Sequence, residues 1–223
     1  MGDNAVVGAV LDYIVEQRLQ TGDRLPTETT LTAMLDVSRP VLREAFSALE
    51  LVGVLAARKG SGRIVMPYDF NSVLEAVTRF VPPRGRWLLD LLSIRQVLET
   101  SLLPVAAPML SPAALARLEG LVSAMEQKAQ AGAYFGAEDA AFHALLYEPL
   151  DNEVLQALLR SFWTTYDRLD RDELAHSQRL DETAAHHRRI LDAINAQDFR
   201  LAAHHLNAHF YDTVYALTGG PAA

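Results

Sequence analysis

Apolar residues recur every three or four positions along most of this chain, which is the spacing of helices with one buried face. Within the first 55 positions the pattern predicts three helices. The first ends near Gly22, and the second begins at Thr27, where Leu-Pro-Thr-Glu reads as a turn followed by a helix cap. The third follows Ser38, a good N-cap residue, contains Pro40 in its first turn and extends to about Gly53.

Two short apolar runs, 54–58 and 63–66, follow the third helix and flank Lys59-Gly60-Ser61-Gly62. Apolar runs around a Gly-x-Gly turn predict a β-hairpin. Only 36–38 separates the second helix from the third, which is typical of a helix-turn-helix. Residues 1–67 are therefore predicted to form a winged helix-turn-helix domain, with the hairpin as its small wing.

No segment after Met66 reads as a strand, and the periodicity predicts six or seven helices up to about Leu217. The first is a short helix over 69–80. The next is a long, largely buried helix from Trp87, whose apolar positions include Val97 and Val105. It also carries Arg95 and Glu99 at the spacing of an i,i+4 ion pair. Ser111-Pro112, a cap residue followed by proline, marks the start of another helix, and a further long helix is expected from about Glu173 to Ala196. The predicted fold is mostly α, with a C-terminal all-α bundle at 68–223 of the kind that can hold a ligand between facing helices.

Charge is divided unevenly between these two regions. The net charge is −8, and the residues up to Met66 carry seven Arg and Lys against eight Asp and Glu, so most of the acidity lies in the second region. The absence of cysteine excludes disulfides, thiolate metal ligands and a cysteine nucleophile. No signal peptide and no membrane-spanning apolar run is evident, so a cytoplasmic location without membrane contact is expected.

Arg39 and Arg43 lie four positions apart, on the same side of the first two turns of the third helix and outside its apolar stripe. Two guanidinium groups near a helix N-terminus suit the DNA major groove, because arginine pairs with guanine edges or phosphates. Lys59 adds positive charge at the wing, where Gly60 permits close approach to a phosphate or the minor groove. The alternative is a solvated helix face whose arginines pair with nearby carboxylates.

Asp139 and His143 lie four positions apart on one predicted helix, so their side chains share a face. His187 and His209 lie about 15 and 18 Å from the turn near position 197, level with each other if the two helices are antiparallel. One carboxylate and three imidazoles would form a divalent transition-metal site, with zinc the commonest choice and nickel, manganese or iron as alternatives. The periodicity also allows His205 in place of His187.

The N-terminal motifs resemble the winged helix-turn-helix of the GntR family of bacterial transcription regulators. They are Leu25-Pro26-Thr27-Glu28, Val37-Ser38-Arg39, Leu42-Arg43-Glu44-Ala45 and Gly60-x-Gly62-x-x-Val65. The resemblance implies that Arg39 and Arg43 contact bases or nearby phosphates, that Ser38 holds a phosphate, and that Gly60 enters the minor groove. Many relatives carry an arginine where this chain has Thr29, so its operator affinity or sequence preference is expected to differ.

The C-terminal motifs resemble the ligand-binding FCD domain of the FadR-like branch of that family. They are Asp139-x-x-Phe142-His143, His187-x-x-Ile190-Leu191-x-Ala193-Ile194, His209 and Arg95-x-x-Leu98-Glu99. The resemblance implies that the Asp and three His residues bind the ion and that a small carboxylate effector completes the coordination. Arg95 is then a pocket residue that pairs with the effector's carboxylate.

The sequence thus predicts a ligand-responsive transcription regulator that binds a palindromic operator as a homodimer, since two-fold pairing doubles the contacts with DNA. The competing class is a metal-dependent α-bundle enzyme, a hydrolase or oxygenase with an accessory N-terminal module, in which the metal activates water. No further carboxylate is spaced as a general base, and that reading leaves the winged helix-turn-helix without a role. A third class is a helical adaptor whose histidines bind nothing.

Overall fold

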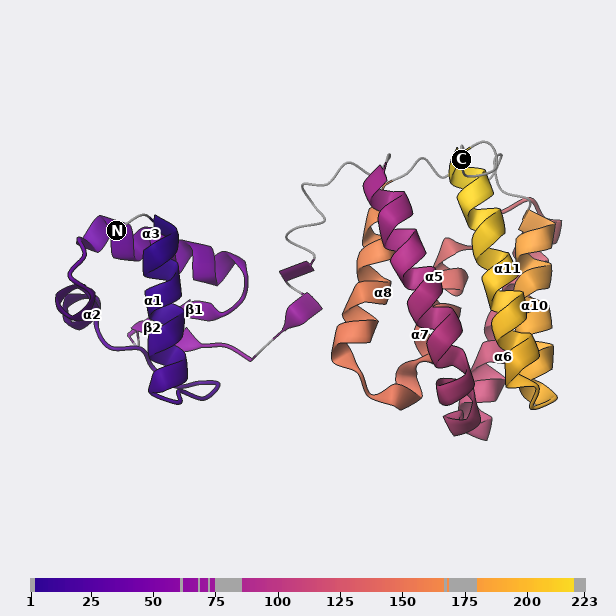
Figure 1. Cartoon of the computed structure of the whole chain (residues 1–223), viewed down its shortest axis with the longest axis horizontal. Coiled ribbons are helices and arrows are strands. Elements are labelled where there is room, and N and C mark those ends of the chain that lie inside the picture. Colours follow the sequence, from indigo (N-terminus) through magenta and orange to yellow (C-terminus); the bar gives the residue numbers. More distant parts are fainter. Residues whose placement is uncertain are drawn as a thin grey trace. The chain divides into compact units, whose positions relative to one another are not determined.

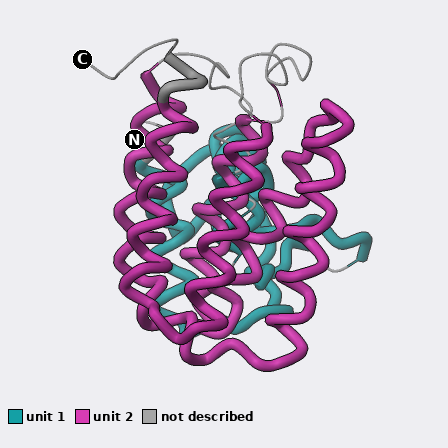
Figure 2. Tube along the Cα trace, turned by 90° about the vertical axis from the view of Figure 1, so that its right-hand side faces the viewer, with its two compact units in different colours: residues 1–77 teal, residues 78–223 magenta. Residues whose placement is uncertain are grey.

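The computed structural model describes residues 3–60, 62–67, 69–71, 73–74, 86–166, 168 and 180–218. The chain divides into two compact units, 1–77 and 78–223, each built around its own hydrophobic cluster (Figure 2). The fold is mostly helical, with one antiparallel hairpin in the first unit (Figure 1), which confirms the predicted fold class. Among the described helices none is long and apolar enough to cross a bilayer.

In its described residues up to Val65 the first unit has three helices followed by the two-stranded hairpin. Their bounds are α1 Asp3–Glu16, α2 Glu28–Leu35, α3 Arg39–Leu51, β1 Leu55–Arg58 and β2 Gly62–Val65. In the hairpin Leu55 pairs with Val65 and Arg58 with Gly62. The apolar stripe of α3 faces inward and packs with buried residues of α1, α2 and both strands, because apolar burial is the main stabilising term.

The helix ends of this unit match the predictions in part. The hydroxyl of Thr27 accepts a hydrogen bond from the Thr30 backbone N–H at 3.2 Å, which confirms the predicted cap of α2. Ser38 occupies the N-cap position of α3, but its hydroxyl makes no capping hydrogen bond. The prediction that the first helix continues to Gly22 is wrong. It ends at Glu16, because Arg18 adopts a left-handed φ of 52° and the Leu19 N–H turns back to the carbonyl of Ile14.

The second unit is a closed ring of α-helices around a shared core. Each helix packs against the next in the order α5, α11, α10, α6, α7, α8 and back to α5 (Figure 1). Two single-turn 3₁₀ helices, η1 Ala107–Met109 and η2 Glu148–Leu150, lie in the connections. The helix bounds are α5 Arg86–Ala106, α6 Pro112–Gln130, α7 Gly136–Leu146, α8 Glu153–Tyr166, α10 Leu180–Asn195 and α11 Phe199–Thr218.

Helix α5 differs from its prediction in how much of it is buried. Leu92 and Leu103 on its inner side are fully buried, as a core helix requires. Val97 and Val105, assigned to the buried pattern, are instead 64% and 56% exposed, because they lie on the side of α5 turned away from the ring core. Most of the helix predicted over 69–80, and the start of the one predicted from Glu173, lie outside the described residues.

Candidate functional site

The two predicted recognition arginines lie at the start of α3 and are exposed. Arg39 and Arg43 stand apart from the buried stripe of the helix, and the side chain of Arg43 is 64% exposed. Arg39 donates a hydrogen bond from Nη2 to the hydroxyl of Thr29 on α2, at 3.2 Å. Ser38, directly before α3, is exposed as well. The structure therefore places these three polar residues together on one accessible end of α3.

The predicted wing residues lie at the turn between β1 and β2. Lys59 and Gly60 are exposed, and Gly60 has a φ of +76°, a conformation that side chains other than glycine rarely adopt. Arg63, by contrast, is part-buried and donates hydrogen bonds to Glu28 and Glu50, so it does not add free positive charge at the wing. The exposed charge of the wing comes from Lys59 and its neighbour Arg58.

In the second unit four residues from three helices form a buried cluster. Asp139 and His143 lie on α7, His187 on α10 and His209 on α11, and the four offer donor atoms that all lie within 4.8 Å of one another. The rings of His187 and His209 are 4.6 Å apart between centroids, so the two residues are level, as counting from the turn predicted. Nδ1 of His187 hydrogen-bonds the backbone carbonyl of Thr183 at 2.8 Å, which leaves Nε2 for the cluster.

The cluster fits a divalent transition metal on the evidence of its unpaired atoms. Nε2 of His143 and Nδ1 of His209 are buried without a hydrogen-bond partner, which costs free energy in a protein interior. Oδ1 of Asp139 lies 3.1 Å from Nε2 of His187 and 3.2 Å from Nε2 of His143. Tetrahedral zinc ligands, each about 2.0–2.2 Å from the ion, lie about 3.4 Å apart. Three imidazoles and one carboxylate at these separations suit such an ion.

The electrostatics of the cluster favour the metal-binding forms of Asp139 and His209. At His143 burial would lower the pKa, but the charge of Glu99 outweighs it and raises that pKa. Burial alone would raise the pKa of Asp139, but His187 and His143 outweigh it and hold that pKa well below its usual range. Burial lowers the pKa of His209 well below its usual range, and the neighbouring His187 adds to this effect. An anionic carboxylate and a neutral imidazole are the forms that coordinate a metal ion.

A buried glutamate supports the cluster from α5, and the sequence reasoning missed this role. The predicted ion pair is present, with Nε of Arg95 donating to Oε1 of Glu99 at 2.5 Å. The other carboxylate oxygen of Glu99 contacts Nδ1 of His143, and the hydroxyl of Tyr147 donates to the Glu99 backbone carbonyl at 2.8 Å. Holding Nδ1 of a histidine fixes which nitrogen is left for a metal. The signal was an ionisable pair within an apolar helix, since such groups are rarely buried without further partners.

A small cavity adjoins the cluster. Arg95, Asp139, His209 and Thr213 form its polar lining, and most of the remaining wall is aromatic. The guanidinium carbon of Arg95 lies 4.5 Å from the ring centroid of Phe162, and Nη2 of Arg95 is buried without a hydrogen-bond partner. The cavity has room for about one water molecule. A positive group with an unused donor therefore lines the same space as two members of the cluster.

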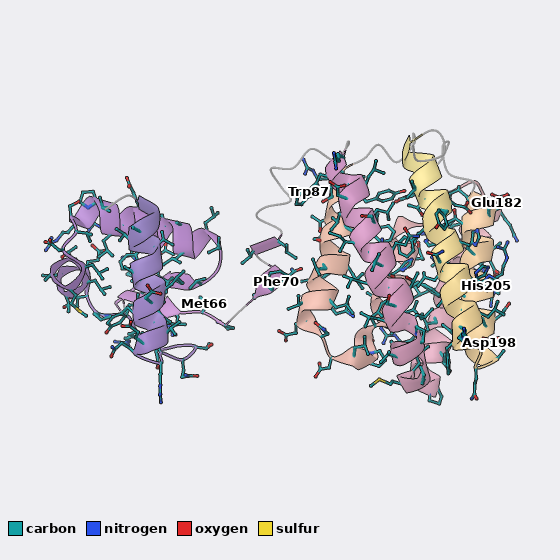
Figure 3. All side chains as sticks on the ribbon, viewed as in Figure 1. Met66, Phe70, Trp87, Glu182, Asp198 and His205 are labelled. Carbon is teal, nitrogen blue, oxygen red and sulfur yellow. The ribbon has the colours of Figure 1, made fainter. Side chains whose placement is uncertain are left out.

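Two other histidines of the described chain, His186 and His205, lie outside the cluster. His186 pairs through Nε2 with Oδ2 of Asp212 at 2.7 Å. His205, the alternative to His187, is part-buried on α11, along the helix from the turn marked by Asp198 (Figure 3). The structure thus gathers His187 rather than His205 with Asp139.

Comparisons with known proteins were made for both units. The family model described as bacterial regulatory proteins, gntR family, matches residues 3–65, and the FCD domain model matches residues 90–212. An uncharacterised HTH-type transcriptional regulator of Bacillus subtilis, YcbG, is 28% identical over 208 residues, covering 92% of this chain and 84% of that protein. The Uxu operon transcriptional regulator of Escherichia coli is 28% identical over 204 residues, covering 88% of this chain and 79% of that protein.

The solved structures add a likeness of fold. Streptococcus agalactiae GntR aligns with a TM-score of 0.59 at 23% identity, covering 95% of this chain and 98% of that one. A GntR family transcriptional regulator from Pseudomonas syringae aligns with a TM-score of 0.51 at 21% identity. These relatives and neighbours are transcription regulators and not enzymes, which decides against the metal-dependent enzyme.

Proposed function

The chain belongs to the GntR family of DNA-binding transcription regulators and carries an FCD ligand-binding domain, and from this premise we propose how it senses its ligand. The regulator binds a palindromic operator as a homodimer, through Ser38, Arg39, Arg43, Lys59 and Gly60. A small carboxylate effector binds beside a divalent metal in the helical unit. The regulator acts in the cytoplasm, where its operator DNA lies.

The observation that carries this proposal is the buried cluster beside the cavity. Asp139, His143, His187 and His209 would hold the ion, which is zinc or alternatively nickel, manganese or iron. When bound, the ion supplies positive charge that attracts a carboxylate. Arg95 lines the adjoining cavity with its unused Nη2, so it can donate a charge-assisted hydrogen bond to the same carboxylate. Two positive groups on one small space select an organic acid over a neutral ligand.

Admission of the effector requires side chains to move, because the cavity has room for about one water molecule. Phe162 and Trp163 on α8 and Phe210 on α11 line it and are buried. We propose that repacking of α8 and α11 around the acid changes the relative placement of the two DNA-binding units in the dimer. The coupling free energy expected for such a change is about 1–3 kcal/mol.

Replacing Arg95 by lysine tests the effector site. Zinc-loaded protein is melted with a panel of small carboxylates, from acetate to citrate, and with their amides. At least one acid is expected to raise the melting temperature while its amide does not, and Arg95→Lys should weaken that acid at least tenfold, because lysine keeps the charge but loses the planar fork. Arg189→Lys, outside the cavity, is the control. Stabilisation by the amides as well, or by no acid, would contradict the carboxylate assignment.

The exposed side of α5 supports self-association of the helical units. From 91 to 110 the exposed residues of the chain include no charged side chain; they are Ser93, Ile94, Val97, Ser101, Val105, Pro108 and Met109. Two copies with a net charge of −8 repel across charged faces, so an uncharged strip about 30 Å long is the side on which they can meet. We therefore assign this strip to a second copy of the chain.

An aspartate at Val97 is expected to break that dimer. Val97 is 64% exposed in the middle of the strip, and two carboxylates near a two-fold axis would repel each other and lose apolar burial. Sedimentation equilibrium should show the dimer dissociation constant of Val97→Asp raised at least about 100-fold. Val154→Asp, on α8, serves as the matched control and should remain dimeric. A dimer of undiminished stability in the Val97 variant would rule out this surface.

A further inference from the structure

Glu28, the first residue of α2, holds side chains from two other elements of the DNA-binding unit. Its Oε2 accepts a hydrogen bond from Nε of Arg43 on α3 at 2.9 Å. Its Oε1 accepts one from Nη1 of Arg63 on β2 at 2.5 Å. One carboxylate therefore joins α2, the second turn of the recognition helix and the wing strand.

Arg63 is fixed independently of Arg43. Its Nε donates to Oε1 of Glu50 at 3.1 Å, and its guanidinium carbon lies 4.5 Å from the ring centroid of Phe46 in the core. Arg63 thus anchors Glu28 to a rigid part of the unit. The carboxylate is held in place on one side and holds Arg43 on the other.

The pairing with Arg43 is more specific than an ordinary surface ion pair, which contributes little to stability. The side chain of Arg43 is 64% exposed, so without a partner it would sample many rotamers. An arginine side chain loses part of its rotamer entropy when it binds a base, so a side chain that is already ordered loses less. Because Glu28 takes only the Nε donor, both terminal nitrogens of Arg43 are left for a bidentate contact.

We propose that Glu28 is a positioning residue for operator specificity: it orders the Arg43 guanidinium for base contact and ties the recognition helix to the wing. The inference rests on the proposed role of Arg43 in base contact. It goes beyond that role because it gives Glu28 a part in specificity that requires no contact of its own with DNA. Thr29, the next residue, accepts from Arg39 in the same way, so consecutive residues of α2 hold both recognition arginines.

The negative charge of Glu28 also favours specific over non-specific DNA binding. Hydrogen bonds from Arg43 outweigh the effect of burial and lower the pKa of Glu28, so the carboxylate is ionised at neutral pH. A carboxylate beside the recognition helix repels phosphates on any sequence and reduces non-specific binding. This repulsion is offset only on a DNA sequence in which Arg43 contacts a base. Glu28 therefore favours specific binding by ordering Arg43 and weakens non-specific binding by repelling phosphates. Both effects raise the ratio of specific to non-specific affinity.

The test compares two DNA duplexes at one salt concentration. The wild-type protein selects a duplex from a random-sequence library, and a scrambled duplex of the same composition serves as the non-specific site. Glu28→Ala should lower the ratio of the two affinities at least tenfold, with binding to the scrambled duplex unchanged or tighter. Glu44→Ala removes the same charge from the exposed side of α3 and should leave the ratio within about twofold of wild type.

A further variant separates positioning from packing of the wing. Glu50→Ala removes the second partner of Arg63 but leaves the hydrogen bond between Glu28 and Arg43. It should keep most of the specificity ratio. A parallel fall in both affinities for Glu28→Ala, an unchanged ratio, or an equal loss of ratio in Glu50→Ala would overturn the assignment. If Arg39→Ala/Arg43→Ala keeps the ratio of specific to non-specific affinity, the proposed role of the arginines in base contact fails. If that variant loses the ratio while Glu28→Ala keeps it, only the positioning role of Glu28 fails.

Discussion

A variant with alanine at both Arg39 and Arg43 is expected to lose sequence-specific DNA binding while its fold is retained. Both side chains are exposed and neither belongs to the buried stripe of α3, so their removal leaves the core intact. A good bidentate arginine contact to a base is worth about 1–3 kcal/mol, so loss of both should weaken binding to the selected duplex at least about 30-fold. Binding to a scrambled duplex should fall much less.

The measurement is a fluorescence anisotropy titration of both duplexes, with circular dichroism melting to verify the fold. The matched control removes two exposed arginines from the helical unit instead, Arg117 and Arg200, so that net charge changes equally. This control should bind the selected duplex with nearly wild-type affinity. If the Arg39 and Arg43 variant still bound it as wild type does, the recognition helix would have been assigned wrongly.

Loss of a single cluster residue is expected to abolish tight metal binding. Asp139→Asn preserves the shape of the side chain but removes its charge, and His209→Gln removes a ligand nitrogen without introducing a charge. Zinc that binds only the folded wild type stabilises it by about 2.7 kcal/mol when free zinc is about 100 times its dissociation constant. That free energy corresponds to about 5–10 °C in melting temperature for a protein of this size.

The measurement is thermal melting with zinc and with EDTA, together with zinc titration by calorimetry. The wild type should lose the stabilisation in EDTA, whereas both variants should melt at the same temperature with or without zinc. His205→Ala is the control, since His205 lies on α11 outside the cluster, and it should behave as wild type. A zinc response in Asp139→Asn equal to that of wild type would show that the ion binds elsewhere.

The periodicity of apolar residues was sufficient to predict most elements of the fold. Caps at Thr27 and Ser111 marked helix starts that the structure confirms, because side-chain capping is a local interaction. The end of α1 was missed because Arg18, a non-glycine residue, takes the left-handed conformation there. The exposure of Val97 was missed because periodicity shows which residues share a face of a helix. It does not show which of those faces is packed against another helix.

The positions of the candidate site residues were predicted better than the polar contacts that support them. Counting along two antiparallel helices placed His187 and His209 at one level, since the rise per residue of a helix is fixed. The contact of Glu99 with His143 joins α5 to α7 across 44 positions, and no periodicity relates those two helices. Glu28 likewise meets Arg63 through the tertiary fold of the wing. Such long-range polar contacts depend on tertiary packing and need the folded chain.

The existence of a metal ion among Asp139, His143, His187 and His209 is tested most directly by anomalous diffraction at the zinc edge. Crystals of untagged protein, purified without chelator and grown with zinc, would be measured above and below the absorption edge. The proposed sensing mechanism predicts an anomalous peak enclosed by the four side chains. A map without a peak there, with the imidazoles and carboxylate in direct contact with one another, would contradict it.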